Sequence, residues 1–240
     1  MESYNDERQP VGATLVREAN QQLLAHVAVW EALGGFAQNA EEGVKQLAEL
    51  KEASPAGEKR RKQLHEALEE KRRECDNLGL SYNQWYVSSA VYSADETEPR
   101  PTLVGDPIVD ILISTYPGNR LPHAWLDFPV RRKLISTNDL AGHGAFTLFT
   151  GHGGSAWRDA ADAISKATGI PIKTYGIGLG LDYIDVYRDW YKSREVEDNG
   201  CVLVRPDRFI AWRSKTMASD AQGKLQQVID SILSRDGLQS

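Results

Sequence analysis

The chain has 240 residues, of which 41% are apolar and 26% charged, so it is long enough to bury a core in one or two domains. No apolar run reaches the roughly 20 residues that span a bilayer, and a membrane protein is not expected. The net charge of −6 repels a phosphate backbone, so nucleic acid is not an expected partner either.

The amino-terminal residues and the two cysteines indicate the cellular compartment. The stretch MESYNDERQP is acidic and polar and cannot serve as a secretory signal, so a cytoplasmic location is predicted. Cys75 and Cys201 lie far apart and form no CxxC motif, so neither a metal knuckle nor a redox pair is expected. Both are interpreted as small buried thiols.

The first third of the sequence predicts three helices. The first helix is predicted between Pro10 and Gly34, with an apolar stripe that needs a partner: Val11, Leu15, Ala19, Leu23, Val27 and Trp30. A second helix is expected at about 41–52. Ser54 and Pro55 provide an N-cap and a favoured first residue for the third helix, which is expected to end near Gly79.

The middle of the sequence predicts a short strand region. The stretch SYNQWYVSSAVYS is rich in aromatic and β-branched residues, which is typical of a strand or a strand pair. Residues 95–107 are expected to form a loop, and a strand is expected at about 108–115. Prolines and a glycine then break regular structure in TYPGNRLPHAWL. We therefore predict two domains, 1–132 and 133–240.

The last hundred residues alternate predicted strands and helices. Strands are expected at 133–139, 145–150 and 171–176, with a helix capped by Ser155 and ending at Gly169. Helical character at 182–192 is followed by a hairpin of CVLV and FIAWR and by a closing helix. This order predicts an α/β or α+β fold with a thioredoxin-like carboxyl-terminal domain. The stretch GHGGS stands where such folds carry a CxxC, so no redox cysteines are expected there.

Two glycine turns invite functional interpretations. Gly151, Gly153 and Ala156 have the GxGxxA spacing of a dinucleotide-binding turn, but no acidic residue ends the following strand, IPIKTYGIG. His143 and His152 lie in these turns without further ligands at recognisable spacing, so no metal site is expected. Ser155 and His152 are also not expected to act as a nucleophile and its base, because Ser155 suits a helix cap better. The aromatic residues near 82–92 suit sheet packing better than the wall of an aromatic-substrate cavity.

Four segments form a combined signature: SYNDERQPVG, TYPGNRLPHAWL, ISTNDLAGHGAFTLFTGHGGSAW and EDNGCVLVRPDRFIAWR. Together they resemble the carboxyl-terminal part of FAD-dependent aromatic-ring hydroxylases, the phenol and dichlorophenol monooxygenase branch in particular. The resemblance covers nearly the whole chain. In that family the first segment follows the flavin-binding domain, and the carboxyl-terminal domain is thioredoxin-like and lacks redox cysteines.

The resemblance implies oxygen chemistry carried out by a larger protein. Complete relatives use NAD(P)H to reduce FAD, which reacts with oxygen and passes one oxygen atom to a phenolic ring. The segments that hold FAD in such enzymes have no match here, so this chain alone is expected to be structural and to bind neither FAD nor NAD(P)H. Its expected partner is the missing flavin-binding domain or subunit, and a homo-oligomer is also open. The sequence leaves open which phenol is hydroxylated and whether NADH or NADPH is used. It also leaves open whether the native gene is longer, split or truncated.

Two residues in PGNRLPHAWL are the candidate contacts with flavin. The resemblance implies that this loop approaches the flavin and substrate domains, so Arg120 could hold a flavin phosphate or an interdomain carboxylate, and His123 could bond a backbone carbonyl. An interdomain latch is the preferred interpretation of both. The alternative for the whole chain is a free-standing thioredoxin-like module whose helical arm binds another protein.

Overall fold

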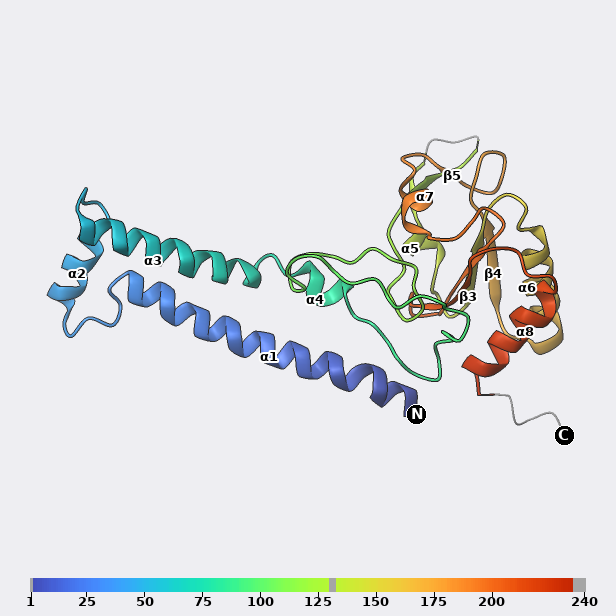
Figure 1. The fold of residues 1–240 in the computed structure, drawn as a ribbon, viewed down its shortest axis with the longest axis horizontal. Helices are drawn as coiled ribbons and strands as arrows, with labels where there is room; N and C mark the ends of the chain where they lie inside the picture. The colour runs from blue at the N-terminus through green and yellow to red at the C-terminus, as the bar shows by residue number, and fades with distance from the viewer. Residues whose placement is uncertain (1, 130–132, 235–240) are drawn as a thin grey trace. The chain divides into compact units, whose positions relative to one another are not determined.

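The computed structural model describes residues 2–129 and 133–234. The chain divides into two compact units (Figure 1). Unit 1 comprises Met1–Glu7, Tyr82–Thr102 and Leu112–Ser240, and unit 2 comprises Arg8–Ser81 and Leu103–Ile111. The predicted domain boundary between residues 132 and 133 adjoins residues outside the described part and stays a prediction.

Unit 2 is helical, as the sequence predicts. Ser54 accepts a hydrogen bond from the Gly57 amide at 3.1 Å, and Pro55 opens the helix behind it, which confirms the predicted start of the third helix. That helix ends at Lys71, well before Gly79, and a single 3-10 turn follows. In chain order the helices are α1 (Glu2–Ala32), α2 (Ala40–Glu49), α3 (Pro55–Lys71), η1 (Arg72–Glu74) and α4 (Leu78–Tyr82), of which α1 begins and α4 ends in unit 1.

Polar contacts join α1 to α3, which run side by side in opposite directions (Figure 1). Lys71 Nζ donates to the Gln22 carbonyl at 3.2 Å, and Arg60 donates to the Ala32 carbonyl at 3.2 Å. The apolar stripe predicted for α1 remains largely exposed within the described residues, with Leu23 64% exposed. The buried residues of α1 are Glu7, Glu18 and Ala32, so most of its large apolar side chains remain on the surface.

Unit 1 is built on a four-stranded sheet. Strands β3 (Phe146–Thr150) and β4 (Ile172–Gly176) are parallel and are connected by α6 (Ser155–Thr168). Strand β6 (Cys201–Val204) pairs antiparallel with β3, and β7 (Ile210–Ser214) pairs antiparallel with β6. The strand order is β4-β3-β6-β7. The predicted strand–helix–strand segment and the predicted hairpin are both confirmed.

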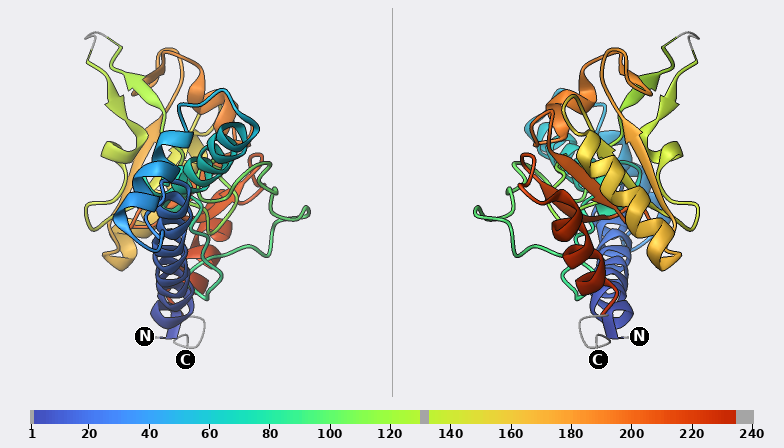
Figure 2. Two further views of the ribbon diagram at one scale, coloured as in Figure 1. Left: turned by 90° about the vertical axis from the view of Figure 1, so that its left-hand side faces the viewer. Right: turned by 90° about the vertical axis from the view of Figure 1, so that its right-hand side faces the viewer.

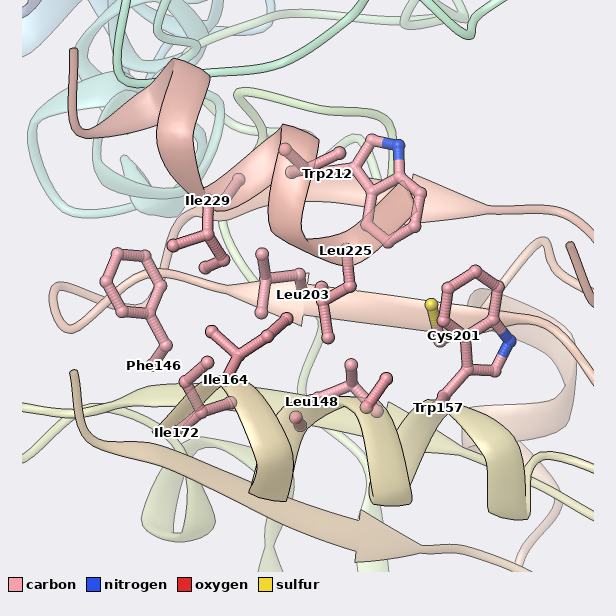
Figure 3. Close-up of a cluster of buried hydrophobic side chains, with 14 of the residues drawn as sticks. Phe146, Leu148, Trp157, Ile164, Ile172, Cys201, Leu203, Trp212, Leu225 and Ile229 are labelled. Atoms are coloured by element: carbon pink, nitrogen blue, oxygen red, sulfur yellow. The ribbon is translucent and has the colours of Figure 1, made fainter. Parts of the chain in front are cut away.

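Each face of this sheet carries its own core, because successive side chains of a strand point to opposite faces. Helices α6 and α8 (Ala221–Ile232) lie side by side on one face (Figure 2). Leu148 and Leu203 meet Trp157 and Leu225 there in a cluster of buried side chains (Figure 3).

The second core includes Phe149, Val202 and Trp190. It packs residues of the four-stranded sheet against a smaller sheet, β2-β1-β5, and two short helices. These elements are β1 (Trp125–Asp127), β2 (Ile135–Ser136), α5 (Thr137–Leu140), β5 (Ile184–Asp185) and α7 (Asp189–Ser193).

Two predicted strands are wrong. The stretch 81–93 ends helix α4 and then runs irregularly, with a single bridge between Trp85 and Asn119. The stretch 108–115 is also irregular, because several of its amides bond to side chains or to the Asp106 carbonyl instead of a neighbouring strand. The Leu112 amide donates to Asn83 at 2.8 Å, and the Thr115 amide donates to Glu195 at 3.1 Å.

Three further predictions of local structure need correction. Ser136 and Asp139 form a capping box that starts α5, so the strand expected at 133–139 is only β2. Helical character at 182–192 is confined to α7, and β5 precedes it. Helix α6 begins at Ser155, but its N-cap is Gly154, which has no side chain to cap with. The C-cap at Gly169, in the left-handed region, is confirmed.

The two cysteines differ in environment. Cys201 is fully buried, as expected, and burial raises the pKa of its thiol well above the ordinary value. Cys75 is exposed, so its interpretation as a buried thiol is wrong. Within the ranges 2–129 and 133–234 we find no helix long and apolar enough to cross a membrane and no group of three metal-ligating side chains.

Candidate functional site

The loop that carries Arg120 and His123 is held by backbone hydrogen bonds on two sides. The Gly118 amide donates to the Ile210 carbonyl at 2.9 Å, and the Tyr86 amide donates to the Gly118 carbonyl at 2.9 Å. The Leu121 amide donates to the Arg208 carbonyl at 2.9 Å. The loop is thus placed against the edge of β7 and fixed on that framework.

Gly118 is required by this arrangement. Its φ is +89°, and a Cβ there would lie 2.2 Å from the Tyr86 carbonyl oxygen. We expect Gly118→Ala to lower the free energy of unfolding by about 2–5 kcal/mol, from backbone strain and overlap together. Gly144 is the matched control, because its φ is +77° but no atom of the described part of the chain outside its immediate neighbours lies within 4 Å of an added Cβ.

Gly144→Ala should cost only the strain of about 1–2 kcal/mol. Urea unfolding of both variants, followed by far-UV circular dichroism, measures the difference. Equal losses in the two variants would mean that the close approach at Gly118 relaxes freely.

Arg120 lies among aromatic rings. Its guanidinium carbon is 5.2 Å from the centroid of the Tyr82 ring and 5.9 Å from that of Phe209. Among the described residues, no hydrogen bond or ion pair engages this guanidinium. Since the charge is held by π-faces and has no carboxylate partner there, its donors remain available for an anion.

His123 lies in a separate environment three residues further along. Its Nδ1 is 2.7 Å from the Ser136 hydroxyl oxygen, and its ring meets Trp125 edge to face at 4.7 Å. The neighbouring backbone is fixed by Thr137, whose hydroxyl donates to the Pro122 carbonyl at 2.7 Å. The ring is exposed and bonds a side chain, so the expected bond to a backbone carbonyl is not made through Nδ1.

The aromatic residues near 82–92 do not form one wall. Tyr86 is 1% exposed and stacks on Phe209 with ring centroids 3.9 Å apart, whereas Trp85 is 43% exposed. The Tyr92 amide bonds the Ala211 carbonyl, and its ring packs on the core beneath α6 and α8. The group therefore serves three different packing roles.

Sequence inspection missed a buried charge network beside this loop. The Arg213 guanidinium donates to Glu96 Oε1 and Oε2 at 2.8 Å each and also pairs with Glu195. The Arg213 and Glu96 side chains are 5% and 4% exposed. Burial opposes the charge on Arg213, but the hydrogen bonds that it donates to Glu96 and Glu195 outweigh this effect and raise the pKa of Arg213.

A second network in unit 1 includes Glu7, from the second turn of α1. Arg205 binds both carboxylate oxygens of Glu7 and also Asp207 at 2.8 Å, while the Ser88 hydroxyl donates to Glu7 at 2.6 Å. Burial opposes the charge on Arg205, but its hydrogen bond to Glu7 and the charge of Asp207 raise its pKa. The sequence signal for both networks is a lone arginine within or beside a buried strand, which needs a buried acid.

The GHGGSA turn at the start of α6 is shaped by packing. A Cβ on Gly154 would lie 1.8 Å from the Thr150 hydroxyl oxygen, and one on Gly151 would lie 2.7 Å from the Asp198 carbonyl oxygen. The structure does bring an acid to the end of β4, which the sequence analysis did not foresee. Asp182 accepts from the Gly176 amide at 2.8 Å and pairs with Arg158 at 3.0 Å, so this carboxylate is already engaged.

Comparison with known proteins places this geometry in a family. Residues 114–235 match the family described as "Aromatic-ring hydroxylase, C-terminal". A phenol 2-monooxygenase from Pseudomonas sp. is 40% identical over 95% of this chain and 37% of its own length. A 2,4-dichlorophenol 6-monooxygenase from Cupriavidus pinatubonensis is 35% identical over 100% of this chain and 40% of its own.

A solved structure agrees. The flavin-dependent monooxygenase PieE, in complex with FAD and substrate, aligns with a TM-score of 0.87 at 36% identity, over 97% of this chain and 39% of PieE. The chain thus spans about two fifths of the length of these relatives. The resemblance inferred from the four sequence segments is confirmed: the chain belongs to the aromatic-ring hydroxylase family and matches its carboxyl-terminal part.

Proposed function

We propose that this chain is the carboxyl-terminal part of a flavin-dependent phenol hydroxylase and that it acts only together with a flavin-binding region. The observation that carries the proposal is the match over nearly the whole chain to a phenol 2-monooxygenase and to two 2,4-dichlorophenol 6-monooxygenases. In the complete enzyme, FAD would use NAD(P)H and oxygen to hydroxylate a phenolic ring. The cytoplasmic location stays a prediction.

The carboxyl-terminal domain is proposed to be thioredoxin-like. Its support is the strand order β4-β3-β6-β7, with β3 and β4 parallel and the β6–β7 hairpin antiparallel to them. The turn before α6 holds glycines and His152 in place of cysteines, and the Cys201 thiol is buried in the core. Disulfide exchange therefore has no sulfur to use at that turn, and a structural role is favoured.

Arg120 is the residue of this chain best suited to meet the flavin-binding region. Its guanidinium is partly exposed, rests on two aromatic rings and has no carboxylate partner among the described residues. It can bind a flavin phosphate or an interdomain carboxylate. His123, held by Ser136 beside Trp125, is proposed to latch the same junction.

Reconstitution tests the proposal. The chain is purified with added FAD, freed of unbound flavin, and tested for its visible spectrum and for NAD(P)H oxidation with a panel of phenols. We expect no stoichiometric flavin and no turnover, because a partly exposed charge such as Arg120 contributes only about 1 kcal/mol and cannot create a flavin site. Adding the flavin-binding region encoded upstream or nearby should restore both.

Variants make this test specific to the loop. Arg120→Ala should weaken FAD retention or turnover of the reconstituted enzyme by about tenfold, which corresponds to about 1.4 kcal/mol. Arg188→Ala is the control, since this exposed guanidinium also lies over a ring, that of Tyr191 at 4.4 Å. Stoichiometric flavin and phenol-stimulated turnover by the chain alone would refute the proposal. Tight binding to another protein, without flavin chemistry in any combination, would favour the interaction module.

A further inference from the structure

A groove of about 420 Å³ runs along α1 in unit 2. Its polar lining includes Glu18 and Gln22 of α1, with Arg73 and Asn77 beyond the end of α3. Its apolar lining is made of short and branched aliphatic side chains: Leu15, Ala19, Leu23, Leu80 and Ile108.

Glu18 is an unusual residue for such a groove. It is only 8% exposed, and its Oε2 has no hydrogen-bond partner among the residues that the structure describes. Its other oxygen, Oε1, is 3.4 Å from Nε of Arg17, an exposed side chain. The side-chain oxygen of Gln22, one helical turn further on, is also buried, and within residues 2–129 and 133–234 it has no hydrogen-bond partner. Two buried acceptors without donors favour a ligand that brings donors and positive charge.

The cations nearest this groove are engaged elsewhere. Lys71 Nζ bonds the Gln22 carbonyl at 3.2 Å and is paired with Glu74. Arg73 donates to Asp106 at 2.7 Å and lies 3.5 Å from Glu70. Arg73 interacts with Glu18 through space, but neither cation forms an ion pair with it among the described residues.

The surface beside the groove indicates a macromolecular occupant. Val16 and Leu24, which flank it on α1, are 63% and 68% exposed, and Leu23 within it is 64% exposed. Exposed apolar side chains around a buried charged residue such as Glu18 are typical of a protein interface. PieE contains the equivalent of 97% of this chain, and that part is only 39% of PieE, so it belongs to a longer chain there.

We infer that the groove binds a lysine or arginine side chain presented by the flavin-binding region. The aliphatic stem of that side chain lies along Leu15 and Leu23, and its charged end bonds Glu18 and Gln22. This inference rests on the proposed function and names the surface through which the two parts of the enzyme recognise each other.

The test uses Glu18→Gln in the full 240-residue chain and two measurements of opposite expected sign. The dissociation constant for the flavin-binding region, measured by calorimetry, should rise about 30-fold or more, because the partner's charge loses its buried counter-ion. The melting temperature of the chain alone should stay unchanged or rise, because the substitution removes a buried carboxylate whose only ion pair among the described residues is with the exposed Arg17. A merely structural glutamate would lower the melting temperature instead.

Glu41→Gln, at an exposed position on α2, is the matched control and should change neither quantity. An unchanged dissociation constant for Glu18→Gln, or a lower melting temperature of the chain alone, would overturn the inference while restored turnover still upheld the proposed function. Sedimentation experiments offer a further test. If the unaltered chain forms a dimer and Glu18→Gln does not, the inference is also overturned, since a second copy of the chain would then fill the groove. If the unaltered chain neither binds the flavin-binding region nor supports turnover, the proposed function and this inference both fail.

Discussion

Trp157→Ala is expected to lower the free energy of unfolding by about 3–5 kcal/mol, a large share of the roughly 5–15 kcal/mol that holds a domain together. The Trp157 side chain is fully buried and meets Trp212 edge to face with ring centroids 5.6 Å apart. Its indole Nε1 also donates to the Asn199 carbonyl at 3.0 Å. The substitution removes this contact area and leaves a cavity and an unpaired carbonyl between α6 and the sheet.

Urea unfolding followed by far-UV circular dichroism measures this loss without depending on tryptophan fluorescence. Trp125→Ala is the control. Because Trp125 is 40% exposed, this substitution should lower the free energy of unfolding by less than about 1 kcal/mol. Comparable losses at the two positions would mean that the core in Figure 3 does not limit the stability of unit 1.

Arg213→Met should be nearly as damaging, at about 3–5 kcal/mol, because it leaves a buried carboxylate without its counter-charge. Glu96 is 4% exposed and loses both hydrogen bonds from the guanidinium. Glu195 is 31% exposed and can regain water. The cost therefore falls mainly on Glu96.

A double variant separates the charge from the packing. Arg213→Met combined with Glu96→Leu should recover most of the lost stability, since a buried ion pair replaced by apolar groups of similar volume is often neutral. The free energies of unfolding of the two single variants and of the double variant complete the cycle. Additive losses would show that the two side chains do not depend on each other.

The sheet of unit 1 could be predicted because its sequence signals are local. Strands β3 and β6 are short apolar runs, and Gly169 ends α6 where a left-handed residue is needed. The hairpin β6–β7 is joined by a turn that includes Pro206 and Asp207, whose residue types are typical of turns.

The errors arose where side chains took over the role of a strand partner. An aromatic run such as 81–93 has the composition of a strand, but Tyr86 instead stacks on Phe209 from a distant part of the chain. In α1 the spacing of apolar residues indicates a stripe but not which side of the helix is buried. Glu18 occupies the buried side, and nothing in its local sequence distinguishes it from an exposed acid.

The candidate loop shows the same limit. Composition and the family resemblance singled out Arg120 and His123, but the sequence did not reveal their contacts. Arg120 packs on aromatic rings, and His123 bonds the hydroxyl of Ser136. A lone arginine in β7 signals a buried acid, yet Glu96 is 117 residues away and Arg213 alone cannot identify it. Such pairs depend on the completed fold.

The bond between Glu7 and Arg205 has a consequence for synthesis on the ribosome. The two residues are 198 positions apart in the chain. At translation speeds of about 5–20 residues per second, the arginine is made roughly 10–40 s after the glutamate. During that interval the Glu7 carboxylate, which the finished fold buries, lacks the arginine that pairs with it there. Unit 1 can therefore complete this ion pair only after most of the chain has been synthesised. A chaperone can bind the nascent amino terminus during the delay.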